Sequence, residues 1–221
     1  MIDVSHKQFF QDALTARENS LVAIASCSSR GQARVLRQAI TDALLNDVLT
    51  VVEVHELLLQ VHLFAGFPAA IEGLVVLREV LQEHGLESSD PIPEHISQDD
   101  LKQRGEKLLA AVYGEKTQRL LAFIGKLSPV LRQWVVIDGY GKVFGREGFS
   151  LYEKELCVIA CLCVLDWPRQ LQAHIRGGVR AGLGREKICA AMRLALLINS
   201  LKYYDSADID ELYSKAISSL A

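Results

Sequence analysis

The feature that most constrains this chain is the run from Leu156 to Leu165, in which every residue is hydrophobic or cysteine. A helix built from such a run has no polar face and must be buried on all sides. The run is too short to cross a bilayer, which needs about 20 residues. Just before it, Ser150 and Glu153 have the spacing of a capping box, in which each side chain pairs with a free backbone N–H at a helix start. We therefore expect a fully buried helix that begins after Ser150.

The residues that follow predict a helical hairpin. Trp167-Pro168 ends the apolar run, and proline suits the first turn of a new helix because its missing N–H would be unpaired there. A second helix is therefore expected from Pro168 to about Gly182, and a third helix from about residue 185 to 203. Glu155 and His174 then lie on antiparallel helices joined by a tight turn.

The rest of the chain shows helical periodicity and no competing strand pattern, which predicts an all-α fold. Residues 85–97, which include two prolines, are interpreted as a linker between a first unit, 1–84, and a second unit, 98–221, within one compact protein. Gly66-Phe67-Pro68 should interrupt a helix. Further helices are expected at 5–17, 32–45, 50–64, 69–83, 100–112, 116–125, 128–137 and 207–220, with a separate apolar segment at 21–27 and a glycine-rich loop at 139–149.

A faint internal repeat relates the two units. LVAIASC at 21–27 is similar to CVIACLC at 157–163, and a helix rich in Arg and Gln follows each, at an offset of about 135 residues. The fold is thus expected to hold two degenerate repeats of a helical-hairpin unit. Where the second repeat has His174, the first offers Arg37, Gln38 or Ala39, so an acid–base pair is expected only in the second.

Composition excludes several kinds of partner. The formal net charge is only −3 and no basic run is present, so nucleic acid is not an expected partner. The first residues lack the basic-then-apolar layout of a signal peptide. No apolar segment looks long enough for a membrane helix. The sequence therefore predicts a soluble, cytoplasmic protein that does not associate with membranes.

The five cysteines point to buried, reduced thiols. Their number is odd, and Cys157, Cys161 and Cys163 lie inside the apolar run, where thiols behave as small hydrophobic groups. No C-x-x-C motif is present, and no histidine or carboxylate completes a metal site at ligand spacing. We therefore expect neither a metal nor another cofactor.

Several motifs together resemble the carboxymuconolactone decarboxylase family. The second half contributes YGKVFGREGFS, KEL at 154–156 and QLQAHIRGGVRAGL, and the first half contributes ELLLQVHLFAGFPAA at 56–70. These matches cover about three fifths of the chain. Their order resembles a tandem duplication in which each copy kept a different part. The resemblance implies an all-helical fold like that of alkylhydroperoxidase D, a member of the wider superfamily.

The resemblance also separates two activities. In alkylhydroperoxidase D, a C-x-x-C motif precedes a histidine, with a glutamate nineteen residues upstream of that histidine. Glu155 and His174 fall on the glutamate and the histidine, but the cysteine positions hold Trp167 and Gln170. A thiol peroxidase needs an accessible thiolate of low pKa with a resolving partner. An antioxidant peroxidase is therefore the disfavoured alternative.

The decarboxylase branch, which also lacks those cysteines, implies a lyase that removes CO₂ from a small carboxylated lactone or related ring compound. This reaction needs a proton donor for the dienolate that decarboxylation leaves. His174 is the candidate acid–base residue, because an imidazole titrates near neutral pH, and Glu155 would orient it. The candidate substrate-binding residues are Arg146, with Arg169 and Arg176 as rivals, His62, and Trp167, which a packing role in the turn would also explain.

A third reading stays open, in which the chain is a non-catalytic helical protein whose site has decayed. Either way a homo-oligomer is expected, since the helix from Leu156 is apolar on all sides and needs covering. The family resemblance implies a trimer or a hexamer.

Overall fold

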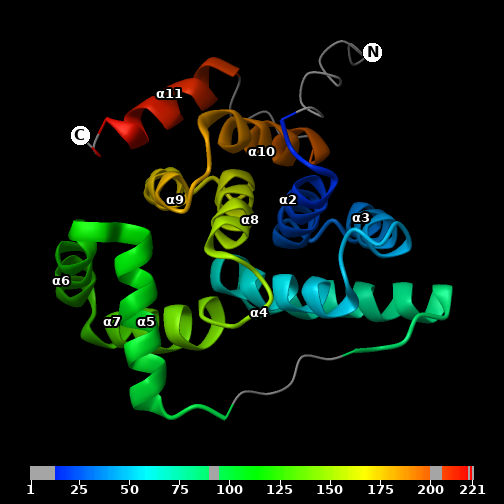
Figure 1. Ribbon diagram of the computed structural model, residues 1–221, viewed down its shortest axis with the longest axis horizontal. Helices are drawn as coiled ribbons and strands as arrows, with labels where there is room; N and C mark the ends of the chain where they lie inside the picture. The colour runs from blue at the N-terminus through cyan, green and yellow to red at the C-terminus, as the bar shows by residue number, and fades with distance from the viewer. Residues whose placement is uncertain (1–12, 90–94, 200–205, 219, 221) are drawn as a thin grey trace.

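The computed structural model describes residues 13–89, 95–199, 206–218 and 220. Within these residues the chain is helical and contains no strand, which confirms the all-α prediction (Figure 1). A short 3₁₀ turn, η1 (Gly114–Lys116), and a π-helix, η2 (Val135–Phe144), accompany the α-helices. These α-helices are α2 (Ala16–Ser29), α3 (Ala33–Leu45), α4 (Val51–His84), α5 (Gln98–Tyr113), α6 (Thr117–Leu127), α7 (Pro129–Trp134), α8 (Leu151–Val164), α9 (Pro168–Arg180), α10 (Arg185–Ile198) and α11 (Ser206–Ile217).

Helix α8 is the central element of the core. Every residue from position 154 to 164 is buried, as the apolar run predicts. Helices α2, α4, α9 and α10 pack around it, so residues from both halves of the chain join one hydrophobic cluster (Figure 1). The cover of α8 thus comes from its own chain, and its apolar surface requires no second copy. The homo-oligomer stays a prediction without that support.

Three helices that meet in the core begin with the same device. Each has a capping box, in which the N-cap hydroxyl oxygen accepts a hydrogen bond from the backbone N–H three residues later. The glutamate at that later position accepts one from the backbone N–H of the N-cap residue. Arg17 ties two of these boxes together, with Nη2 2.5 Å from Glu53 Oε1 and Nε 2.7 Å from Glu153 Oε1. The box predicted at Ser150 is confirmed. The three pairs are Thr15 with Glu18, Thr50 with Glu53, and Ser150 with Glu153.

Helix α4 folds back on itself at Gly66, as the Gly-Phe-Pro motif predicts. Gly66 has φ 82° and ψ 172°, a conformation that glycine adopts without steric cost. Gly73 on the second arm packs so tightly on the first that an added Cβ would lie 2.6 Å from Leu58 Cδ2. The prediction that no apolar segment is long enough for a membrane helix is wrong by length and composition alone, because α4 meets both criteria. No other helix in the described part of the chain does. The fold-back means that its residues do not form one straight rod.

The predicted glycine-rich loop at 139–149 is wrong as far as Phe144, because these residues continue the π-helix η2. The glycines serve close helix packing instead of turns. A Cβ on Gly141 would lie 2.2 Å from the backbone oxygen of Leu101, and one on Gly105 would lie 2.0 Å from that of Val136. Helices α5 and η2 therefore cross at backbone contact.

The prediction of a helix over 5–17 followed by a separate segment at 21–27 is also wrong where the structure describes it. Residues 16–29 form one continuous helix, because Thr15 is its N-cap and fixes its start. Residues 1–12 lie outside the described residues.

Helix lengths and backbone angles agree with the register of the predicted repeat. Helices α2 and α8 both have 14 residues, and α3 and α9 both have 13. Positive φ angles occur at Gly31 and Asp166, and again at Asp47 and Gly182. Each pair is 135 residues apart, since 166 − 31 and 182 − 47 give the same difference. The repeat itself, like the proposed unit boundaries, stays a prediction.

The crossing of α5 and η2 gives a direct test of the packing. Gly141→Ala should lower the free energy of unfolding by about 1–3 kcal/mol, because the added methyl group would overlap a backbone oxygen. Gly139→Ala, on the same helix, is the matched control, since its nearest heavy atom would lie 3.7 Å away. Chemical denaturation measures both, and equal effects would contradict this packing.

Candidate active site

The structure brings Glu155 and His174 together, as their spacing predicts. His174 Nδ1 lies 3.0 Å from Glu155 Oε2, and Glu155 is completely buried. With Glu155 ionised, the carboxylate can only accept, so Nδ1–H is the donor of this hydrogen bond. The other ring nitrogen, Nε2, is thereby left as an acceptor. The pair joins the middle of α9 to the first turns of α8.

A glycine makes room for this pair. Gly177 follows His174 by three residues on α9, and a Cβ there would lie 2.8 Å from Glu155 Oε2. Any larger residue would therefore push the carboxylate away from the imidazole. Glu155 Oε1, the second oxygen, is buried and has no hydrogen-bond partner among the residues that the structure describes. The carboxylate is thus held through its contact with His174.

Two tyrosines extend the pair into a chain of hydrogen bonds. The Tyr140 hydroxyl donates to the Tyr113 oxygen at 3.0 Å, and the Tyr113 hydroxyl lies 3.4 Å from His174 Nε2. Burial raises the pKa of Tyr113 to about 12, although the bond from Tyr140 opposes this. Burial likewise raises the pKa of Tyr140 well above its usual value. Both phenols are therefore neutral near pH 7, and Tyr113 can donate to His174.

Sequence reasoning missed both tyrosines. Tyr113 is the last residue of α5 and Tyr140 lies in η2, the segment that the glycines had suggested to be a loop. Phe64 from α4 completes the surroundings with its ring edge-on to the imidazole, 5.8 Å between centroids. The site thus draws on α4, α5, η2, α8 and α9. Each contact in it joins residues of two different elements, so no single sequence motif contains both partners.

A cavity of about 480 Å³ opens beside Tyr113. His174 does not line it, so Tyr113 is the group through which the buried pair meets the cavity. Arg176, one of the two rival arginines, lies in its wall. The lining residues are Tyr113, Lys116, Arg119, Leu120, Phe123, Ala173, Arg176 and Arg180.

The other predicted substrate-binding residues lie elsewhere. Arg146 binds the carboxylate of Glu56, with Nε 2.7 Å from Oε2 and Nη2 2.6 Å from Oε1. His62 packs against Phe67, with 4.9 Å between ring centroids. Trp167 is exposed at the start of α9. None of these three lines the cavity beside Tyr113, so their role in binding substrate stays a prediction that this geometry does not support.

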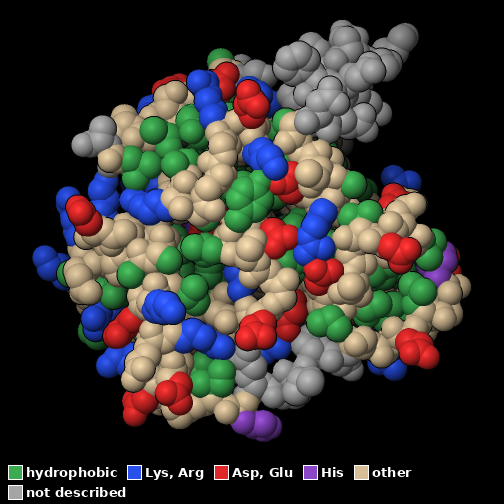
Figure 2. Space-filling model, in the orientation of Figure 1, with side chains coloured by type: hydrophobic (Ala, Val, Ile, Leu, Met, Phe, Trp, Pro, Cys, Tyr) green, Lys and Arg blue, Asp and Glu red, His purple; other side chains and the backbone are tan. Residues whose placement is uncertain are grey.

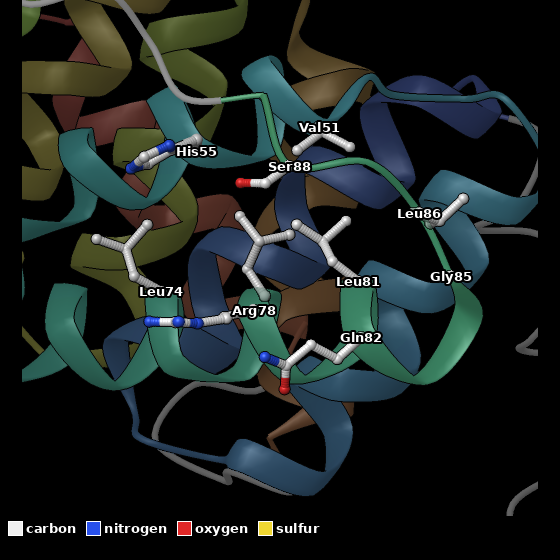
Figure 3. Close-up of a pocket in the computed structure, with 10 residues that line it drawn as sticks. Val51, His55, Leu74, Arg78, Leu81, Gln82, Gly85, Leu86 and Ser88 are labelled. Atoms are coloured by element: carbon white, nitrogen blue, oxygen red, sulfur yellow. The ribbon is translucent and has the colours of Figure 1, made fainter.

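A larger cavity, of about 780 Å³, lies between the two arms of α4 and the residues after it (Figure 3). His55 from the first arm and Arg78 from the second line it together with leucine side chains, Leu74 and Leu81 among them (Figure 3). It contains neither member of the Glu155–His174 pair. Its lining combines apolar side chains with four polar ones, those of His55, Arg78, Gln82 and Ser88.

The cysteines do not offer thiol chemistry. All five are buried and free of disulfides. Burial raises the pKa of Cys161 and of Cys163 to about 12, the opposite of what a reactive thiolate needs. In the described part of the chain, no three His, Cys, Asp or Glu side chains are grouped so that they could hold a metal ion.

The buried phenol of Tyr113 should make stability depend on pH. In the unfolded chain a tyrosine ionises near pH 10, whereas in the folded protein Tyr113 ionises near 12, so its contribution is complete below pH 10 and is lost as pH rises toward 12. Between about pH 8 and about pH 11 the free energy of unfolding should fall by about 1 kcal/mol less in Tyr113→Phe than in the wild type. Urea denaturation at the two pH values measures this, and identical pH dependences would contradict it.

Comparison with known proteins agrees with the sequence motifs. The model of a family described as "Carboxymuconolactone decarboxylase family" matches residues 1–79, a range that includes ELLLQVHLFAGFPAA but neither Glu155 nor His174. Peroxisomal protein 2 of Saccharomyces cerevisiae is 25% identical over 168 residues, covering 65% of this chain and 59% of its own. Peroxisomal protein 2 of Schizosaccharomyces pombe is 29% identical over 140 residues, covering 61% and 62%.

The chain thus spans about three fifths of the length of these curated relatives. Their similarity extends beyond the range that the family model matches. The all-helical architecture is the one that the resemblance implies. The family match therefore confirms the predicted resemblance to the carboxymuconolactone decarboxylase family for residues 1–79.

Proposed function

We propose that the protein is a lyase that decarboxylates a small carboxylated ring compound, such as an unsaturated lactone, by acid–base chemistry. The observation that carries the proposal is the hydrogen-bonded series from Glu155 through His174 to Tyr113, which ends at a cavity of ligand size. A buried carboxylate–imidazole pair connected to a cavity is typical of a site for proton transfer.

The reaction has a simple balance. The bond between the ring and its carboxylate breaks, CO₂ leaves, and the electron pair moves into the ring system as a dienolate. One proton must then be added to carbon. Tyr113 is the group placed to donate it, because it is the only residue of the series that lines the cavity.

The residues behind Tyr113 would restore its proton. The proton consumed in each turnover comes from solvent. His174 would accept it at Nε2, as an imidazolium stabilised by the Glu155 carboxylate, and pass it to the Tyr113 oxygen at 3.4 Å. The hydroxyl of Tyr140 donates to the same oxygen and would stabilise the transient phenolate. In this scheme Tyr113 contacts the substrate, while His174 and Glu155 act through it.

The names of the relatives bear on location and not on chemistry. Both are called peroxisomal proteins, so the expected cytoplasmic location stays a prediction. Neither name states a reaction. The lyase proposal therefore rests on the site and on the family match.

Release of CO₂ from a series of carboxylated unsaturated lactones tests the proposal. His174→Gln and Tyr113→Phe should each lower kcat by about 10²–10⁴, the usual contribution of a positioned acid–base group. Tyr213→Phe is the matched control, since Tyr213 lies on α11 with its ring against Arg185. Unchanged turnover in His174→Gln would overturn the proposal. A wild type that decarboxylates none of the lactones would instead favour the non-catalytic helical protein.

A further inference from the structure

We propose that the cavity beside Tyr113 binds an organic phosphate, with the phosphate group on its four cationic side chains and the apolar part of the ligand against Leu120 and Phe123. This inference adds a ligand class to the proposed function. The reaction that would follow binding rests on the proposed function, whereas binding of the phosphate compound does not.

The charge of the cavity wall is the first observation. Lys116, Arg119, Arg176 and Arg180 line the cavity, and no carboxylate is among the described residues that line it. Figure 2 shows Lys and Arg side chains gathered on the side of the molecule where α6 and α9 lie (Figure 1). A concave surface of one charge sign concentrates ligands of the opposite sign. The ligand should therefore be an anion.

Two of the arginines are held close together on one helix. Arg176 and Arg180 are four residues apart on α9, a spacing at which like charges repel. Burial lowers the pKa of Arg176, and the charge of Arg180 lowers it further. Arg176 also donates from Nη1 to the backbone oxygen of Ala216 at 3.4 Å. An anion beside the two guanidinium groups would offset their mutual repulsion.

The local backbone holds Arg180 in place. Its Nη1 donates to the backbone oxygen of Val112 at 2.8 Å. Gly114, at φ 58°, lets the guanidinium lie over the end of α5, where an added Cβ would be 3.1 Å from Arg180 Nε. One N–H group of the Arg180 guanidinium is thus used for positioning. The other N–H groups of the guanidinium are therefore held in place before a ligand binds. Such pre-organisation lowers the entropic cost of binding.

The number of donors favours phosphate over carboxylate. One carboxylate is satisfied by one bidentate arginine. This cavity offers three arginines and a lysine from η1, α6 and α9. A phosphate monoester carries up to two charges and three peripheral oxygens, so it can use several guanidinium forks at once.

The remaining wall indicates that the phosphate is attached to an organic group. Leu120 and Phe123 contribute apolar surface, and Phe123 is 59% exposed, an unusual position for a large aromatic side chain. A planar group could stack on the Phe123 ring with its far end toward Tyr113. The cavity, at about 480 Å³, is within the range of small-molecule sites.

Isothermal titration calorimetry of the full chain at fixed salt tests the ligand class with three probes: phenyl phosphate, benzoate and inorganic phosphate. Phenyl phosphate should bind at least about tenfold more tightly than benzoate, which has the same ring but a carboxylate. Arg119→Gln should weaken phenyl phosphate binding by about tenfold. Arg34→Gln removes the same charge from the exposed surface of α3 and should change it less than about twofold.

Phe123→Ala separates the apolar contact from the charged one. It should weaken binding of phenyl phosphate while leaving that of inorganic phosphate unchanged. Benzoate binding as tightly as phenyl phosphate, equal losses in Arg119→Gln and Arg34→Gln, or no saturable binding of phenyl phosphate would each overturn the proposal. Because binding is measured without turnover, the two proposals can fail separately. Phenyl phosphate can bind to a protein that decarboxylates no lactone, and a protein that decarboxylates a lactone can fail to bind phenyl phosphate.

Discussion

The candidate site depends on one buried contact, the hydrogen bond from His174 to Glu155. A carboxylate removed from water is strongly unfavourable unless it is paired, and here the imidazole is its partner. Helices α8 and α9 pack closely enough for this contact because Gly177 has no side chain to displace the Glu155 carboxylate. Because the pair is buried and does not line the cavity, the proposed mechanism gives the contact with substrate to Tyr113.

The two halves of the chain contribute differently to the structure around this pair. The first half, with its folded-back α4 and the capping boxes joined by Arg17, covers α8 and fixes where it begins. The second half supplies the titratable series and most of the cavity wall. Phe64 is where the two halves meet at the site, since its ring lies edge-on to the imidazole. The family match falls on the supporting half, so it explains the scaffold more directly than the chemistry.

Much of the architecture could be predicted because its determinants are local. The Ser150 capping box, the apolar run and Pro168 define the hairpin, and the nineteen-residue spacing places Glu155 opposite His174. Of the residues that line the cavity beside Tyr113, only Arg176 was among the candidates named from the sequence. Tyr113 is 61 residues from His174 in the chain, and the cavity combines side chains from α5, η1, α6 and α9. The ion pair of Arg146 with Glu56, 90 residues away in the chain, could not be predicted either.

The protonation state of His174 tests the central claim most directly. In ¹⁵N-labelled protein, NMR of the imidazole nitrogens should show a neutral ring protonated at Nδ1, with a bare Nε2 whose chemical shift changes in Tyr113→Phe. Glu155→Gln should abolish the strong preference for this tautomer. A ring protonated at Nε2 in the wild type, or a tautomer unaffected by Glu155→Gln, would contradict the account.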